Sequence, residues 1–199
     1  PHGLSQQPDF LIIKNLGASQ NWDLYFRGVT GSNQVMEINT TNALTTTGVT
    51  VWNSVDSTKV SARGASFATS TNSRVVYFWH SVPGFSKFGS YTGAGEQKFV
   101  PLGFRPAWVM IKRYTDNTVG EWTIYDSART PSNEIQKKLW ANNTSSEEDH
   151  PNNSIDFVSN GFVIDPGTDA PNVQYTNNGS VGYLYAAFAE NPFKIARAR

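Results

Sequence analysis

The carboxylates expected at strand ends are the residues whose type could support acid–base chemistry. They are Asp126, Asp156, Asp165 and Glu190. A glycosidase needs two carboxyl groups about 5 to 10 Å apart across a cleft, one of them with a raised pKa. The spacing of these acids selects no pair, and acids at strand ends are commonly solvated turn residues. We therefore expect a protein that is not an enzyme, and keep a polysaccharide depolymerase as an alternative.

Groups that could hold a metal or act as a nucleophile are sparse. The chain has no cysteine, and its histidines are scattered at His2, His80 and His150. Disulfides and thiol catalysis are thereby excluded, and no zinc triad is indicated. The oxygen-rich loops Glu147–His150 and Asp165–Asp169 lack the spacing of a known calcium loop. We predict neither a metal nor a cofactor.

The charge pattern narrows the class of partner. The formal net charge is zero and only 16% of the residues are charged, with both signs interspersed. A phosphate-backbone binder depends on clustered cations, so we expect no nucleic acid. The sequence contains no run of about eighteen apolar residues, so we expect no membrane insertion. No basic-then-apolar leader precedes the first expected strand, and we predict no secretory signal.

The aromatic residues, 13% of the chain, are the candidate ligand-binding groups. Saccharide sites stack flat rings on sugar faces while amides bond the hydroxyls, and rings are also enriched at protein interfaces. Trp22, Trp108 and Trp122 lie in expected strands and are predicted to be core residues. Two other tryptophans stand beside asparagine-rich loops, where either an exposed binding face or ordinary packing is possible. The candidate ligand-binding residues are Trp52, Asn53, Trp140, Asn142 and Asn143.

A hairpin in the second half of the chain would position these groups. Trp108–Lys112 is a run of apolar, β-favouring residues, and Trp122–Asp126 alternates apolar and polar residues with a period of two. Tyr114–Gly120 is predicted to be the loop that connects these two strands. The same pair occurs near the start of the chain, at Phe10–Lys14 and Trp22–Phe26. Other expected strands are Val35–Asn39, Val49–Trp52, Lys59–Ser61, Ser66–Ala68, Arg74–His80, Phe99–Leu102, Lys137–Asn142, Ile155–Val158, Phe162–Asp165 and Val181–Ala189.

The repeated hairpin predicts an internal duplication. The offset between partners grows from 98 at Pro8 and Pro106 to 100 at the hairpin tryptophans and 103 at Asn39 and Asn142. Loop insertions in a second copy would produce such an ordered drift. The alternative is that two β-rich halves resemble each other only because both are built from the same strand-forming residue types. We divide the chain into a first β-rich copy, residues 1–90, and a second, residues 91–199. The hinge is expected within Val82–Gly95, with the copies packed as one compact unit.

The spacing of strands and turns sets the fold class. Short strands recur every 8–12 residues or so between glycine- and asparagine-rich turns, which predicts an all-β fold, an antiparallel β-sandwich or jelly roll. Asn160-Gly161 is the residue pair favoured in a tight hairpin. Ser132–Leu139 is the sole helical candidate, because Glu134 and Lys138 are spaced to pair on a helix.

Five ordered motifs carry a resemblance to a known family. They are Trp79–Gly93, Gly103–Arg113, Ile124–Arg129, Ile155–Phe162 and Ala186–Lys194. Together they resemble an uncharacterised domain of tailed-bacteriophage virion proteins, especially tail-fibre-like proteins of marine phages. The resemblance covers nearly the whole chain and is weakest between Val29 and Ala65.

The resemblance implies a structural protein of the phage particle, in a tail fibre or spike that meets the host surface. Its expected partners are other virion proteins and a host-surface saccharide. Such fibres are usually homotrimers, so the resemblance also implies a homotrimer. It further implies synthesis in the host bacterial cytoplasm and localisation to the virion. One alternative is a capsid-decorating or tail-joining structural module without glycan binding, and the other is the depolymerase.

Overall fold

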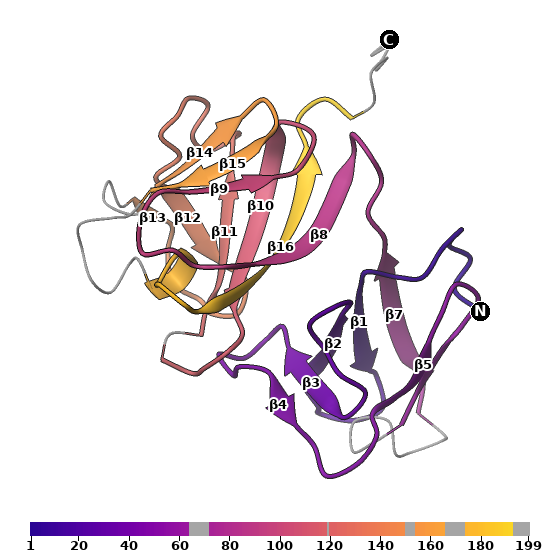
Figure 1. Ribbon diagram of the computed structural model, residues 1–199. Helices are drawn as coiled ribbons and strands as arrows, with labels where there is room; N and C mark the ends of the chain where they lie inside the picture. The colour runs from indigo at the N-terminus through magenta and orange to yellow at the C-terminus, as the bar shows by residue number, and fades with distance from the viewer. Residues whose placement is uncertain (64–71, 119, 150–153, 166–173, 193–199) are drawn as a thin grey trace.

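The computed structural model describes residues 1–63, 72–118, 120–149, 154–165 and 174–192. These residues form an almost entirely β structure in which every described strand pair is antiparallel. The predicted all-β sandwich class is therefore confirmed (Figure 1). The strands are β1 (Phe10–Asn15), β2 (Trp22–Phe26), β3 (Gln34–Glu37), β4 (Thr45–Thr46), β5 (Trp52–Val55), β6 (Val60–Ala62), β7 (Arg74–Trp79), β8 (Ser86–Thr92), β9 (Lys98–Pro101), β10 (Pro106–Arg113), β11 (Trp122–Asp126), β12 (Lys137–Trp140), β13 (Glu148–Asp149), β14 (Ile155–Val158), β15 (Gly161–Ile164) and β16 (Gly182–Ala189).

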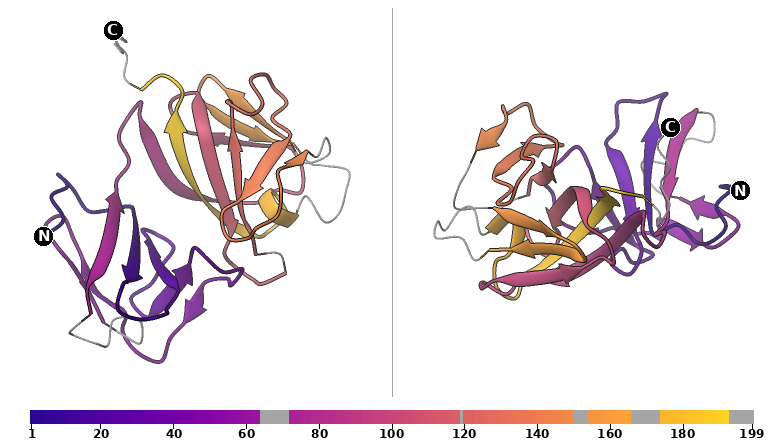
Figure 2. Two further views of the ribbon diagram at one scale, coloured as in Figure 1. Left: turned by 180° about the vertical axis from the view of Figure 1, so that it is seen from behind. Right: turned by 90° about the horizontal axis from the view of Figure 1, so that it is seen from above.

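Two central sheets, each covered on its outer face by a smaller one, make up the fold. The first central sheet has the strand order β4-β3-β2-β1-β7, and the second has the order β13-β12-β11-β10-β16-β8. The hairpin β5–β6 covers the first, while the three-stranded sheet β14-β15-β9 covers the second (Figures 1 and 2). The inner faces of the two central sheets are turned toward each other.

Side-chain alternation along the central strands produces this layering. In β1, Leu11 and Ile13 pack under the β5–β6 hairpin, whereas Phe10 and its neighbours on the other face join a cluster shared by both halves. In β10, Val109 packs into the core beneath β14 and β15, whereas Met110 enters the shared cluster. Each central sheet is therefore apolar on both faces, and the shared cluster holds the two halves together.

The two central sheets have the same strand pairing. In the first hairpin Lys14 pairs with Trp22, and in the second Lys112 pairs with Trp122. The backbone N–H of each of these tryptophans donates to an asparagine side chain after the third strand of its sheet, at 2.8 Å in both cases. A late strand, β7 or β16, pairs with the first strand of the hairpin, β1 or β10, and the second sheet has one further strand, β8, beyond β16. The shared order and register agree with the predicted duplication, which stays an inference about ancestry.

A loop of the first half binds the β10–β11 hairpin of the second. The backbone N–H of Leu44 donates to the carbonyl of Tyr114 at 3.0 Å, and the Lys112 ammonium donates to the carbonyl of Thr41 at 3.0 Å. Gly120 allows this close approach, because a Cβ there would lie 1.8 Å from the Thr41 carbonyl oxygen. These contacts fix how the central sheets face each other.

Three sequence predictions need comment. The helical prediction for Ser132–Leu139 is wrong: Ile135 bridges to Ile155, and Lys137–Trp140 is β12, because pairing with β11 outweighs the helical spacing of Glu134 and Lys138. The expected hinge contains β8, which pairs with β16, so the passage between the sheets lies between Trp79 and Ser86. The predicted strand Ser66–Ala68 lies outside the described residues.

Candidate functional site

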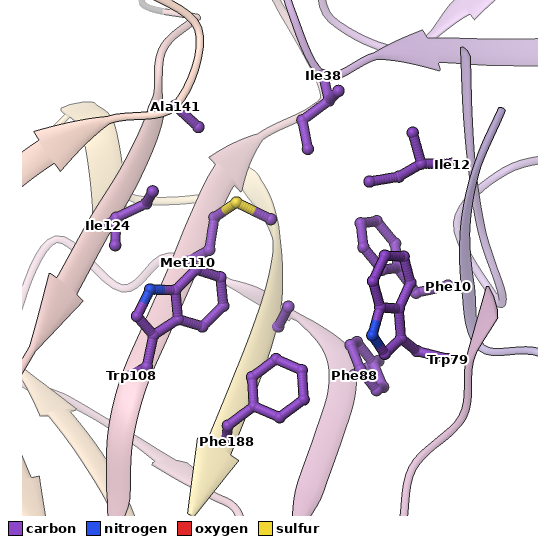
Figure 3. A pocket seen from close by; sticks show the side chains of 11 residues that line it. Phe10, Ile12, Ile38, Trp79, Phe88, Trp108, Met110, Ile124, Ala141 and Phe188 are labelled. Carbon is purple, nitrogen blue, oxygen red and sulfur yellow. The ribbon is translucent and has the colours of Figure 1, made fainter. Parts of the chain in front are cut away.

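An apolar groove lies between the facing central sheets. One cavity in it has a volume of about 270 Å³, and its walls carry equivalent positions of the two sheets (Figure 3). Phe10 faces Trp108, Ile12 faces Met110, and Ile38 faces Ala141. The remaining lining residues are Trp79, Phe88, Ile124, Ala186 and Phe188. All of these side chains are aliphatic or aromatic, and their only hydrogen-bond donors are the indole N–H groups of Trp79 and Trp108. No sequence pattern predicted the groove.

Aromatic rings form a continuous path along the groove. Trp79 contacts Phe10 with ring centroids 5.1 Å apart, Phe10 stacks on Phe88 at 5.7 Å, and Phe88 contacts Phe188 at 5.8 Å. The path reaches solvent at both ends: Tyr77 stacks on Trp79 and is 45% exposed, while Phe85 packs on Phe188 and is 37% exposed. The groove is thus a surface feature that the two halves form only together.

A second cavity extends the groove. It also measures about 270 Å³ and shares Ile12, Ile38 and Ala141 with the first. Trp22 and Asn39 complete its lining, and Asn39 contributes the polar group at this end. The Asn39 Oδ1 accepts from the Trp22 N–H at 2.8 Å, and its Nδ2 donates to Asn21 Oδ1 at 3.0 Å.

The chemistry of the groove follows from its lining. A sugar hydroxyl buried in the first cavity would find no side-chain oxygen as acceptor, and its only possible side-chain donors are the indole N–H groups of Trp79 and Trp108. A hydroxyl left unpaired there costs about 1–3 kcal/mol. No lining residue is titratable, so the groove supplies no general acid or base. It can bind an apolar group by removing that group and the aromatic walls from water.

Of the two alternatives for Trp52, the structure shows ordinary packing and not an exposed binding face. The Trp52 side chain is only 4% exposed, its Nε1 donates to the Gln34 carbonyl at 2.8 Å, and its ring packs edge-on against Tyr25 at 5.3 Å. Strand β5 lies on the outer face of the first sheet and turns Trp52 inward to cover it. Asn53, the next residue, is exposed.

Trp140 lies at the surface of the second half as part of an aromatic cluster. Its half-buried ring is 4.8 Å from that of Tyr175, and the Lys138 ammonium lies 4.8 Å from the Trp140 centroid and 5.2 Å from that of Tyr175. Lys138 is fully buried, which lowers its pKa, while its ion pair with Glu148 at 3.3 Å opposes that shift. Tyr175 was missed by sequence reasoning because it lies far from Trp140 in the sequence, in a short helical turn (residues 174–176) with no periodic pattern.

The two predicted asparagines beside Trp140 differ in role. Asn142 Oδ1 accepts from the backbone N–H of the fully buried Trp122, as Asn39 does for Trp22 in the first half. Asn142 therefore stabilises the second hairpin. Asn143 is exposed, and its Oδ1 accepts from the Ser145 N–H in a local turn, at 2.9 Å. Trp140 thus contacts Tyr175, and the exposed Asn143 follows Trp140 along the chain, while Trp52 and Asn53 lie on the other half.

The candidate acids are distributed over separate contacts. Asp126 pairs with Arg129, and Glu190 pairs with Arg105 at 2.9 Å. Asp156 is the exception, because burial and the nearby carboxylates of Asp165 and Glu134 raise its pKa. Asp156 and Asp165 are therefore the pair that the depolymerase alternative would use.

A cluster of metal-binding side chains is absent from the part of the chain that the structure describes. Within it, no three His, Asp or Glu side chains gather closely enough to hold a metal ion. The predicted loops Glu147–His150 and Asp165–Asp169 lie partly outside the described residues, at His150 and at residues 166–169.

Comparison with protein families assigns the chain to a family. A family model described as a domain of unknown function, DUF7483, matches residues 1–192. The chain belongs to this family. No curated protein and no solved structure matches it. Among the described residues, no helix is long and apolar enough to cross a bilayer.

Proposed function

We propose that this DUF7483 chain is a non-enzymatic virion domain of a tailed bacteriophage, in a tail fibre or spike that attaches to a host-surface saccharide. The support for a phage origin is the resemblance of five ordered motifs to such virion proteins. Expected partners are other virion proteins, with assembly as a homotrimer. Sedimentation equilibrium of the chain tests the trimer, and a monomer at all concentrations would contradict it.

The observation that supports saccharide attachment is the aromatic surface at Trp140. Trp140 and Tyr175 are both partly exposed, and exposed polar residues such as Asn143 follow along the chain. Partly open rings beside amides and carboxylates suit the two faces of a sugar, one apolar and one hydroxylated. Glu148, 38% exposed in its side chain, can accept hydroxyl hydrogen bonds. Its ion pair with Lys138 fixes its position.

Binding of the chain to a glycan array and to whole host cells tests this proposal. Trp140→Ala and Asn143→Ala should each reduce retention on the array, since they remove a ring surface and an amide. Tyr77→Ala is the matched control, because Tyr77 is an exposed aromatic residue on the other half. Binding that survives Trp140→Ala, or no binding at high micromolar concentration, would contradict saccharide attachment through this surface.

A second candidate function is a structural module that joins virion parts or decorates the capsid. The exposed rings of Tyr77 and Phe85 favour it, because both extend an apolar surface that a neighbouring protein could cover. Phage particles carrying Tyr77→Ser should then lose this domain from the virion while the purified chain still folds. Normal incorporation would contradict the structural role of this surface.

A further inference from the structure

The groove between the central sheets has the dimensions of a site for one small apolar ligand. We propose that it binds the alkyl chain of a single free amphiphile, a medium-length fatty acid or alcohol of about ten carbons, with the polar head at Asn39. This inference is independent of the saccharide surface at Trp140. It rests on the volume, the shape and the lining of the groove.

The volume sets the size of the ligand. An apolar cavity of about 150 Å³ holds a six-carbon benzene ring, so the 270 Å³ of the first cavity corresponds to about ten carbons. The polar head of the ligand then lies in the second cavity, which Asn39 lines. That volume also lies near the lower end of the range for small-molecule pockets, about 300–1,000 Å³. A fused multi-ring ligand or a whole helix is too large for this space.

The shape favours a linear chain. The second cavity continues from the first through Ile12, Ile38 and Ala141, so the available space is elongated. It leads from the Phe88 and Phe188 end toward Asn39. An unbranched alkyl chain can follow such a path by rotating about its single bonds. A rigid ligand would fill one cavity and leave the other open.

The lining provides the affinity and the direction. Along the first cavity all the lining side chains are aliphatic or aromatic, which suits methylene groups, each contributing about 0.8 kcal/mol on full burial. At the other end, Asn39 retains one N–H and one oxygen lone pair beyond its bonds to Asn21 and Trp22. The Lys14 ammonium donates to the Gln20 carbonyl and lies 5.7 Å from the centroid of the Trp22 ring, which lines this end, so its positive charge also suits an anionic head.

The concave walls distinguish a free amphiphile from a lipid bilayer. Membrane attachment needs apolar side chains that project outward, as in an interfacial amphipathic helix. The rings of Trp108, Phe10 and Phe188 instead face into the groove from opposite sheets, where a bilayer surface cannot reach them (Figure 3). The ligand must therefore leave its aggregate and enter as one molecule.

Quenching of tryptophan fluorescence by ω-bromodecanol, below its aggregation concentration, tests the proposal. Trp79 and Trp108 line the cavity, so the bromine should quench them in a saturable manner. Ala141→Phe and Ile38→Phe fill the groove from opposite walls, and each should weaken binding about tenfold or more. Ala128→Phe is the matched control, because Ala128 is also an exposed alanine but lies outside the lining. Its affinity should equal that of the wild type.

Three results would overturn the proposal. The first is the absence of saturable quenching, and the second is an unchanged affinity in both Ala141→Phe and Ile38→Phe. The third is occupation of the groove by something else. Co-sedimentation with phosphatidylcholine vesicles that Ile38→Phe abolishes would identify a bilayer, and a self-association that Ile38→Phe abolishes would identify a second copy of the chain. Saccharide binding is expected to be unaffected by Ile38→Phe, so the two proposals can fail separately.

Discussion

The buried ammonium of Lys112 should make the stability of the protein depend on alkaline pH. Lys112 is fully buried and donates to the carbonyls of Thr41 and Gly120, at the contact between the two halves. Burial lowers its pKa from 10.5 to about 8, although the nearby Glu121 carboxylate acts in the opposite direction. Between these two pKa values the unfolded chain binds more protons than the folded one. The free energy of unfolding therefore rises with pH.

The expected gain in stability from Lys112 is about 2 kcal/mol between pH 7 and pH 9.5, from the linkage relation with pKa values of about 8 folded and 10.5 unfolded. The pH range stops at 9.5 because of the buried tyrosines. Burial raises the pKa of Tyr183 and Tyr185 to about 12, whereas tyrosines of the unfolded chain ionise near pH 10. At higher pH this difference lowers the free energy of unfolding. Lys138, whose pKa is also lowered, adds to the gain.

Urea denaturation at both pH values, followed by circular dichroism, measures this gain. Lys112→Met should reduce it by about 2 kcal/mol, leaving the part that Lys138 contributes. Lys14→Met is the matched control, because Lys14 has the equivalent register position in β1 but is only half-buried. It should retain the full gain. A wild-type stability that stays flat between the two pH values, or an equal gain in Lys112→Met, would refute the reasoning.

Three further changes test the architecture and the absence of catalysis. Gly120→Ala should lower the unfolding free energy by about 1–3 kcal/mol, because its Cβ would lie 1.8 Å from a carbonyl oxygen of the facing loop, whereas Gly48→Ala meets no atom within 4 Å and should be tolerated. Asn142→Ala should lower the unfolding free energy by about 1–3 kcal/mol, because it leaves the buried Trp122 N–H unpaired. Asn143→Ala at the surface should lower it by less than about 0.5 kcal/mol. Chemical denaturation measures both pairs. Host polysaccharide should release no reducing ends with the wild type; release that Asp156→Asn abolishes would establish a depolymerase.

The sequence predicted the strands well where a periodic pattern and a repeat coincided. Phe10–Lys14 and Trp108–Lys112 are β1 and β10, apart from their terminal residues, because apolar runs bounded by turns leave few alternatives. The tryptophans of those hairpins lie in or against the shared cluster, as expected. The structure adds the register, in which equivalent lysines and tryptophans pair in both hairpins.

The groove and the true environment of Trp52 could not be predicted from the sequence. Alternation shows that Phe10 and Ile12 share one face of a strand, but which sheet covers that face depends on tertiary packing. The neighbouring asparagine suggested that Trp52 could be exposed. Side chains alternate along β5, however, so Asn53 is exposed while Trp52 turns inward and covers the sheet. Trp140 and Tyr175 lie far apart in the sequence, and no local pattern predicts their contact.

The most direct test of attachment is cryo-electron microscopy of phage particles that carry this chain, at a resolution that places Trp140. We expect a domain at the distal end of a tail fibre or spike, with the surface at Trp140 and Tyr175 facing away from the particle. A domain buried between tail or capsid proteins, with that surface covered by a neighbour, would contradict it.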